Sequence, residues 1–112
     1  MKQLTKQVDD KGTICWHLND KLHRDDGPAV EWTDGSKCWY LNDTLHRVDG
    51  PAIEYIYGYK CWYKHGKIHR ENGPAMEYAN GEQYWYLNNK MVPIFSLSKY
   101  CIRIAKKRSI MG

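Results

Sequence analysis

The sequence predicts a mainly β protein: a single meandering antiparallel sheet of stacked 23-residue hairpin repeats with a C-terminal capping α-helix. Three near-identical segments, LHRDDGPAVEW, LHRVDGPAIEY and IHRENGPAMEY, begin at Leu22, Leu45 and Ile68 and so lie 23 residues apart. A fixed period of roughly 20–50 residues is typical of repeat architectures. Short β-prone runs separated by turn residues predict strands within each repeat, and a helical spacing of apolar residues appears only near the C-terminus.

Most positions of the repeat recur in every copy. A shift of 23 residues aligns Cys15, Cys38 and Cys61; Trp16, Trp39, Trp62 and Trp85; His17, Tyr40, Tyr63 and Tyr86; Leu22, Leu45, Ile68 and Met91; His23, His46 and His69; Arg24, Arg47 and Arg70; Glu31, Glu54 and Glu77; and Trp32, Tyr55 and Tyr78. Gly-Pro-Ala also recurs, starting at residues 27, 50 and 73. We therefore divide the chain into an N-terminal lead-in (1–11), a repeat domain (12–91) and a basic amphipathic helix (94–108).

Each repeat contains strand and turn signals in a fixed order. AVEWT and KCWYL are short β-prone runs joined by Asp34-Gly35, a dipeptide that favours a hairpin. A second reversal is expected at Asn42-Asp43, and the Asp-Gly-Pro that begins at Asp49 should close the unit. Successive units then extend one sheet. Its first strand, within 12–18, would have an open edge, so a homo-oligomer is one expectation.

The C-terminal segment differs from the repeats in spacing and in charge. Leu97, Tyr100, Cys101, Ile104 and Ala105 form a helical stripe behind the N-cap candidate Ser96, which predicts a helix that covers an end or a face of the sheet. The basic residues of this segment are Lys99, Arg103, Lys106, Lys107 and Arg108. The remainder carries 12 basic and 13 acidic residues, so the repeats are nearly neutral and a dedicated nucleic-acid-binding fold is disfavoured.

The bulk composition favours a water-soluble protein. No apolar run approaches the roughly 18–20 residues that span a bilayer. The N-terminal residues contain no apolar core of a secretory signal, so a cytoplasmic location is expected.

The combination of Trp-Tyr-x-Asn with His-Arg-x-Asp-Gly-Pro-Ala resembles the MORN-variant repeat proteins, over about residues 12–91. It is especially similar to the subtype that is frequent in bacteriophages and large DNA viruses. If the protein is phage-encoded, the expected cytoplasmic location is the host cytosol. The resemblance implies a curved sheet of stacked hairpins that acts by binding, and it transfers no catalytic residue.

The histidine, arginine and cysteine columns admit both a functional and a structural interpretation. His46 and His69 could be acid, base or ligand groups, but residues that repeat with the fold more often hold it together. The shared period of Arg47 and Glu54 predicts an Arg–Glu pair in each unit. The cysteines are expected to be buried free thiols, because equivalent positions two or three strands apart are too distant for a disulfide or for a shared zinc ion.

The aromatic columns are the strongest candidates for a binding surface. Alternation along a strand places the Trp column on one face, and the Cys column with the Tyr40 column on the other. One row should form the core, and the other could stack on a base, a nucleotide or a partner's side chains. The structural alternative is that both rows simply pack between repeats. The candidate binding residues are Tyr40, Tyr63, Tyr86, Trp39, Trp62, Trp85, His46, Arg47, His69 and Arg70, with the basic tail Lys99, Arg103, Lys106, Lys107 and Arg108 as a second group.

The expected function is a non-enzymatic binding module without cofactor or metal. Our leading hypothesis is a phage or viral protein that binds and inhibits or recruits a host protein, for example in a defence system. One alternative is sequestration of a nucleotide-like ligand on the aromatic rows. Another is binding of RNA or single-stranded DNA through the aromatics and the basic tail. An enzyme is the least favoured class, because no singular catalytic triad, phosphate loop or metal-binding spacing occurs.

Overall fold

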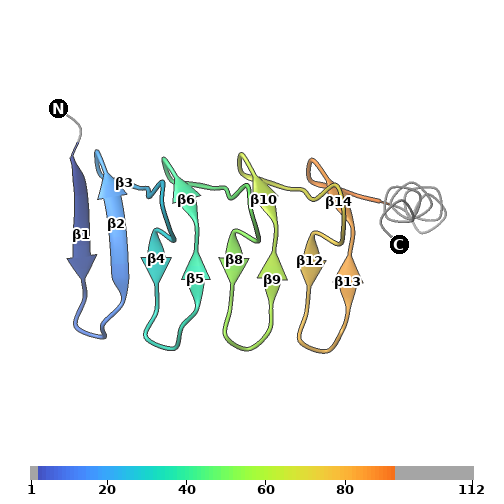
Figure 1. The fold of residues 1–112 in the computed structure, drawn as a ribbon, viewed down its shortest axis with the longest axis horizontal. Helices are drawn as coiled ribbons and strands as arrows, with labels where there is room; N and C mark the ends of the chain where they lie inside the picture. The colour runs from blue at the N-terminus through green and yellow to red at the C-terminus, as the bar shows by residue number, and fades with distance from the viewer. Residues whose placement is uncertain (1–2, 93–112) are drawn as a thin grey trace.

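The computed structural model describes residues 3–92, and these fold into an extended stack of β-hairpins (Figure 1). Its strands are β1 (Leu4–Val8), β2 (Ile14–Leu18), β3 (Lys21–Leu22), β4 (Val30–Glu31), β5 (Lys37–Cys38), β6 (Tyr40–Leu41), β7 (Thr44–Leu45), β8 (Ile53–Glu54), β9 (Lys60–Cys61), β10 (Tyr63–Lys64), β11 (Lys67–Ile68), β12 (Met76–Glu77), β13 (Gln83–Tyr84), β14 (Tyr86–Leu87) and β15 (Lys90–Met91). No helix occurs in residues 3–92, so none there could span a membrane. The predicted helix at 94–108 lies outside the described residues and stays a prediction.

The main sheet is an antiparallel meander in the order β1-β2-β4-β5-β8-β9-β12-β13, with β3 paired to β2. Its register repeats with the sequence: Val30 faces Cys38, Ile53 faces Cys61 and Met76 faces Tyr84. Contacts between units repeat as well, since Cys38 faces Ile53 and Cys61 faces Met76. The predicted mainly β meander of hairpins is therefore confirmed.

The prediction of one uninterrupted sheet was too simple. Strands β6–β7, β10–β11 and β14–β15 form separate two-stranded ribbons above the main sheet. The main ladder reaches Trp39, whose N–H donates to the Ala52 carbonyl, and then meets Pro51. Because proline has no N–H, the ladder cannot continue past it, and the chain turns into the ribbon instead.

The lower hairpins of Figure 1 are closed by loops with one glycine each. In the β4–β5 hairpin the Gly35 N–H donates to the Trp32 carbonyl, and the Trp32 N–H donates to the Ser36 carbonyl. Gly35 has φ +96°, in the left-handed region where a side chain would strain the backbone. This is the three-residue loop in which a glycine follows a type I turn, as the Asp-Gly signal predicts.

The upper ribbons are closed by two-residue turns with positive φ at both central residues. Asn42 has φ 49° and Asp43 φ 62°, and Asn88 and Asn89 repeat this geometry at 49° and 69°. Asparagine and aspartate tolerate this region better than other side chains, which explains the predicted reversal at Asn42-Asp43.

The first strand of the repeat domain is not an open edge, contrary to our expectation. Five residues of the lead-in form β1, which pairs with β2 along its whole length from Leu4–Leu18 to Val8–Ile14. β1 contains no Gly-Pro, so its ladder is longer than those inside the stack. At this end of the sheet the exposed edge is therefore that of β1, where Lys6 opposes pairing with another strand.

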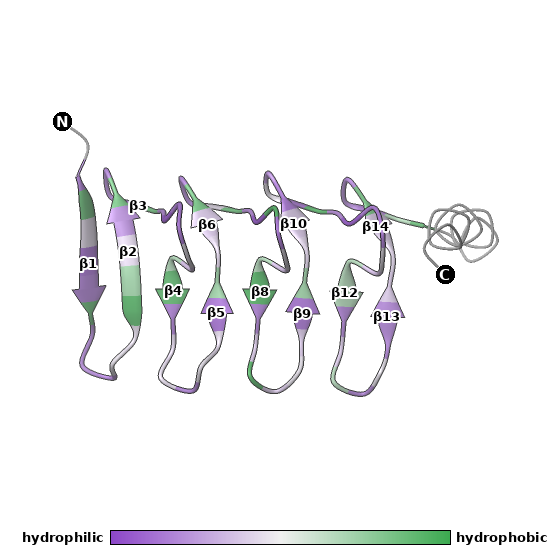
Figure 2. Ribbon diagram, viewed as in Figure 1, coloured by the Kyte–Doolittle hydropathy of each residue, from purple (hydrophilic) through white to green (hydrophobic). Residues whose placement is uncertain are grey.

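The core lies on the cysteine side of the sheet. Val30, Cys38, Ile53 and Cys61 are buried and in contact, and the flanking side chains include Tyr40, Tyr63, Leu45 and Ile68. Figure 2 shows the hydrophobic colour at β4 and β8, which contribute Val30 and Ile53. The expected placement of the Cys and Tyr40 columns on one face is thus confirmed.

Candidate functional site

On the tryptophan face, an arginine lies over a tryptophan ring in each of three successive units. The guanidinium carbon of Arg47 lies 3.8 Å from the centre of the Trp39 ring, and Arg70 lies 3.9 Å from that of Trp62. Arg24 lies 4.5 Å from the Trp16 ring centre. These are cation–π contacts, which stabilise both side chains. Of the tryptophans that we expected to form a stacking platform, Trp39 and Trp62 are therefore already in contact with the chain's own arginines.

Each of these arginines is also held by hydrogen bonds. Arg47 Nη1 donates to the Glu54 carboxylate at 2.8 Å and to the Pro51 carbonyl at 3.0 Å. Its Nε donates to Asp49 at 3.0 Å. Arg24–Glu31 and Arg70–Glu77 repeat the pair at 3.2 and 3.5 Å. The predicted Arg–Glu pairs are confirmed, and they give these arginines a structural role.

The histidine column joins neighbouring units. His23 Nδ1 accepts the Asn42 N–H at 3.0 Å, and His46 and His69 accept the N–H groups of His65 and Asn88 in the same way. The other ring nitrogen of His23 lies 3.2 Å from Asp25, whereas Val48 stands at the corresponding position after His46. These imidazoles support backbone turns, which is the structural interpretation of the column.

The remaining predicted binding residues lie in three places: at the core, in the last unit, and outside the described residues. Tyr40 and Tyr63 pack on the core, and burial raises the pKa of Tyr63 to about 12. Tyr86 and Trp85 are half-buried in the last unit, which continues with Val92-Pro93 in place of His-Arg. The basic residues Lys99, Arg103, Lys106, Lys107 and Arg108 lie outside the described residues.

The cysteines behave as packing residues. Cys15, Cys38 and Cys61 are free thiols, and Cys38 and Cys61 are buried. Burial raises the pKa of Cys38 to about 11, so its thiol stays protonated near neutral pH. Within residues 3–92 no three His, Cys, Asp or Glu side chains gather where they could hold a metal ion.

A row of aromatic rings lies on the cysteine face. Trp32, Tyr57 and Tyr78 are exposed, whereas Tyr55, Tyr59 and Tyr84 are half-buried and the first two of these pack on the core. We call Trp32, Tyr55, Tyr57, Tyr59, Tyr78 and Tyr84 the aromatic ladder. Its ring centres are 6.1 Å apart between Trp32 and Tyr55, 5.0 Å between Tyr59 and Tyr78, and 5.7 Å between Tyr78 and Tyr84. Tyr55 joins Tyr59 at 5.7 Å and Tyr57 at 5.4 Å. The ladder thus crosses three hairpins without a break.

The third hairpin loop adds exposed apolar groups to the ladder. Ile56 is 63% and Tyr57 66% exposed, although the corresponding loop positions hold Thr33-Asp34 and Ala79-Asn80. Figure 2 shows this loop between β8 and β9 with a hydrophobic segment. Ile56 lies beside Gly35 of the preceding loop and the Tyr57 ring contacts that of Tyr55, and both side chains leave a large apolar surface uncovered.

The sequence indicated part of this surface but did not single it out. Trp32, Tyr55 and Tyr78 were visible as a repeat column, yet we placed the binding residues on the Trp39 and Tyr40 columns. The available signal was the departure at Ile56-Tyr57 from the polar turn pattern of the other units.

Carboxylates lie at both ends of the ladder. Asp34 follows Trp32 in its loop, and its Oδ1 accepts the Ser36 N–H at 2.8 Å. At the other end Glu82 accepts hydrogen bonds from Tyr84 Oη at 2.6 Å and from the Asn80 amide at 2.7 Å. These bonds hold the pKa of Glu82 below its usual value, and the bond from Tyr84 has the largest effect. The carboxylate is therefore ionised at neutral pH.

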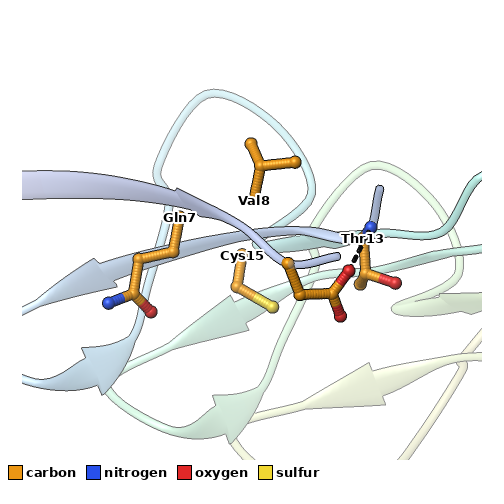
Figure 3. Close-up of a pocket in the computed structure, with 5 residues that line it drawn as sticks. Gln7, Val8, Thr13 and Cys15 are labelled. Atoms are coloured by element: carbon orange, nitrogen blue, oxygen red, sulfur yellow. Dashed lines mark hydrogen bonds between the residues drawn. The ribbon is translucent and has the colours of Figure 1, made fainter. Parts of the chain in front are cut away.

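A shallow pocket of about 430 Å³ lies at the opposite end of the stack (Figure 3). It is lined by Gln7, Val8, Asp9, Thr13 and Cys15. The Asp9 carboxylate accepts the N–H groups of Lys11 and Thr13 at 2.9 Å, and these bonds lower its pKa. Burial and Asp9 raise the pKa of Cys15. The Asp9 carboxylate is already hydrogen-bonded and the Cys15 thiol stays protonated, so this pocket is a poor candidate for nucleophilic chemistry.

Comparison with known proteins assigns no family to the chain. It matches no protein-family model, no curated protein and no solved structure. The resemblance to MORN-variant repeats therefore stays a prediction, and function must be argued from the geometry itself.

Proposed function

We propose that the chain is a non-enzymatic binding module that holds a protein partner on the aromatic ladder. The observation that carries the proposal is the unbroken row of rings from Trp32 to Tyr84 with the exposed Ile56 and Tyr57 beside it. Tyrosine and tryptophan are enriched at protein interfaces, because they bury a large apolar area and keep a polar group for hydrogen bonding.

The rigidity of the repeat sheet supports the same proposal. Ile56 N–H donates to Ser36 Oγ at 2.9 Å, so adjacent loops are fixed relative to each other. A surface that is ordered before binding loses less conformational entropy when the partner arrives. The resemblance to phage and viral repeat proteins favours a host protein as that partner, which the module would inhibit or recruit.

Two other hypotheses receive less support from the described residues. Stacking of a nucleotide on Trp39 or Trp62 would require displacement of Arg47 or Arg70 from the ring. Binding of RNA or single-stranded DNA relies on the basic tail, and Asp34 and Glu82 beside the aromatic ladder would repel phosphates.

The proposal predicts that partner binding depends on the third loop. Tyr57→Ser removes an exposed ring and leaves the turn intact, so we expect it to weaken capture of the partner about tenfold or more. The measurement is native mass spectrometry of the tagged wild type and variant isolated from the producing cells. Val48→Ser is the matched control, because Val48 is 88% exposed and lies outside the ladder.

Each outcome discriminates between the hypotheses. A protein that is captured by the wild type and by Val48→Ser, but lost with Tyr57→Ser, supports the proposal. Equal capture by all three proteins contradicts the assignment to the ladder. A bound mass of nucleotide size with nucleotide ultraviolet absorbance would move the function to ligand sequestration.

A further inference from the structure

The first hairpin, β1–β2, repeats the loop of the later hairpins without their aromatic residue. In this loop the Asp9 N–H donates to the Thr13 carbonyl, and the Gly12 N–H donates to the Asp9 carbonyl. The N–H and the carbonyl of Trp32 make the same two bonds in the next hairpin. Asp9 therefore takes the place that Trp32 has there, and a carboxylate replaces a ring.

The cysteine face is less well covered at this hairpin than in the later units. Gln7 pairs with Cys15, whereas the apolar Val30 pairs with Cys38 at the same register of the next hairpin. Cys15 is only half-buried, although Cys38 is buried. The pocket of about 430 Å³ lies here, with Cys15 between Gln7 and Thr13 (Figure 3). It corresponds to space that the chain's own side chains fill in the later units.

The lining of the pocket favours a long side chain with a positive end. Hydrogen bonds from backbone N–H groups, above all that of Thr13, lower the pKa of Asp9, so its carboxylate is ionised at neutral pH. Gln7 adds an amide oxygen that can accept a hydrogen bond. The rest of the lining, Val8 and the protonated Cys15 thiol, is uncharged. An apolar stem with a cationic end matches this combination.

The loops around the pocket add to its negative charge. Residues 9–13 and 32–36 form neighbouring loops, since a methyl group added at Gly12 would lie 2.7 Å from Thr33 Cγ2. The two loops contain one basic and three acidic residues, a net charge of −2 (1 − 3): Lys11, Asp9, Asp10 and Asp34. Such a surface attracts cations and repels anionic ligands.

Trp32 supplies an aromatic surface beside the pocket. Ile14 pairs with Glu31, so the next residues outward, Thr13 and Trp32, occupy adjacent positions on neighbouring hairpins. Trp32 is 37% exposed. A planar guanidinium can stack on an aromatic ring and pair with a carboxylate, whereas an ammonium group is a point charge. Arginine therefore fits this site better than lysine.

The chain uses the same combination of groups on its tryptophan face. There the Arg47 guanidinium lies 3.8 Å from the centre of the Trp39 ring and donates to the Glu54 carboxylate. All three arginines of residues 3–92 lie over tryptophan rings of that face. A guanidinium for the pocket therefore has to come from outside these residues.

We propose that the pocket receives an arginine side chain of the protein partner that the aromatic ladder binds. The guanidinium lies at Asp9 and against the exposed part of the Trp32 ring, and the methylene stem lies along Cys15. The inference rests on the proposed function, because the pocket adjoins the Trp32 end of the ladder and the arginine belongs to the same partner. Arginine is one of the residues that most often anchor protein interfaces.

The test titrates the full chain with Nα-acetyl-arginine amide and follows the backbone amide signals by nuclear magnetic resonance. We expect saturable shifts at Asp9, Thr13 and Cys15, with about millimolar affinity, because a single side chain buries little surface. Nα-acetyl-citrulline amide has nearly the same shape without the charge and should bind about tenfold more weakly. Nα-acetyl-lysine amide should bind about threefold more weakly than the arginine probe.

Two variants with the same change of charge test the role of the Asp9 carboxylate. Asp9→Asn keeps an Oδ1 acceptor for the N–H groups of Lys11 and Thr13, so the loop should stay folded. It should weaken binding of the arginine probe about fivefold at low salt. Asp20→Asn is the matched control, because Asp20 is exposed in the same unit and Asn89 holds the corresponding position of the last unit. Equal effects of the two variants would mean that general charge attraction holds the probe, and the inference would be wrong.

Failure of the inference and failure of the proposed function give different results. If partner capture is lost with Tyr57→Ser but is unchanged with Asp9→Asn, and the arginine probe does not bind, the ladder holds its partner without this arginine and the inference is wrong. If the citrulline or the lysine probe binds as tightly as the arginine probe, the pocket does not select a guanidinium and the inference is also wrong. If the arginine probe binds through Asp9 but capture of no protein depends on Tyr57, the selectivity of the pocket stands and the function proposed for the ladder falls.

Discussion

Arginine, tryptophan and glycine act together at the residue scale. The Arg47 guanidinium lies over the Trp39 ring on one side and close to the Gly50 backbone on the other. A methyl group added at Gly50 would lie 2.9 Å from Arg47 Cζ, and one added at Gly73 would lie 2.7 Å from Arg70 Cζ. A side chain in place of the glycine of Gly-Pro-Ala would thus have to displace the guanidinium.

Gly50→Ala tests this requirement. The added methyl group should displace Arg47 from Glu54 and from the Trp39 ring, and we expect a loss of about 1–3 kcal/mol in the free energy of unfolding. Urea denaturation measures the loss. In Arg47→Ala the guanidinium is absent, so adding Gly50→Ala to that variant should cost much less. A full additional loss in the double variant would mean that the methyl group clashes with something else.

The elements show which features the sequence could predict. Hairpin positions followed from Asp34-Gly35 and Asn42-Asp43, because turn chemistry is local. The pairing of Arg47 with Glu54 followed from their shared period. The role of β1 could not be predicted from the repeat, because its residues Leu4–Val8 lack the Gly-Pro that marks the other units.

The binding surface was harder to predict than the fold. Alternation assigns side chains to faces, but it does not say which ring another part of the chain covers. Arg47 covers Trp39, whereas Tyr57 stays exposed because its loop projects beyond the sheet. Such coverage depends on packing between segments, which a local pattern does not contain.

The junction between β6–β7 and β10–β11 differs from the other junctions and predicts a dependence on pH. The His46 and His65 rings are 4.4 Å apart, and His65 stands where other units have Asn42 or Asn88. Burial is the main cause that lowers the pKa of His46 below 6.5, and the charges of His65 and Lys64 lower this pKa further. Val48 stands where other units have an acidic residue, so no carboxylate offsets these charges.

The sign of the pH effect follows from this lowered pKa. Protonation of His46 is easier in the unfolded chain, so stability is full above about pH 6.5 and falls as the pH decreases toward the folded-state pKa. His65→Asn removes the neighbouring imidazole and restores the repeat residue, so it should lose less stability than the wild type on acidification. Urea denaturation at about pH 7.5 and pH 5 compares them. Equal losses would show that the histidine pair does not contribute.

At the scale of the whole molecule, stability is the sum of units and of contacts between neighbours. His23 accepts a bond from the next unit at Asn42, and Leu22 N–H donates to Asp43 Oδ1 at 2.7 Å. Such ties link a unit to the next one along the chain. The fold should therefore tolerate a change in the number of units.

Deletion of residues 46–68 tests this independence. It joins Leu45 to His69, which has the repeat position of His46, so every register is preserved. We expect the shortened chain to keep its β circular-dichroism signal per residue and to unfold at a lower urea concentration, since one set of contacts is lost. Deletion of residues 46–57 removes about half a unit and should abolish cooperative unfolding. Similar behaviour of the two deletions would contradict the repeat model.

The meander has a mechanical consequence. β1 and β13 form the two ends of a stack in which the hydrogen bonds between strands run along the stacking direction. A force that pulls these ends apart loads one pair of strands at a time, as in opening a zipper, and does not shear many bonds together. The chain should therefore yield to tension at low force and in steps, and each step would release one unit and dismantle one rung of the aromatic ladder.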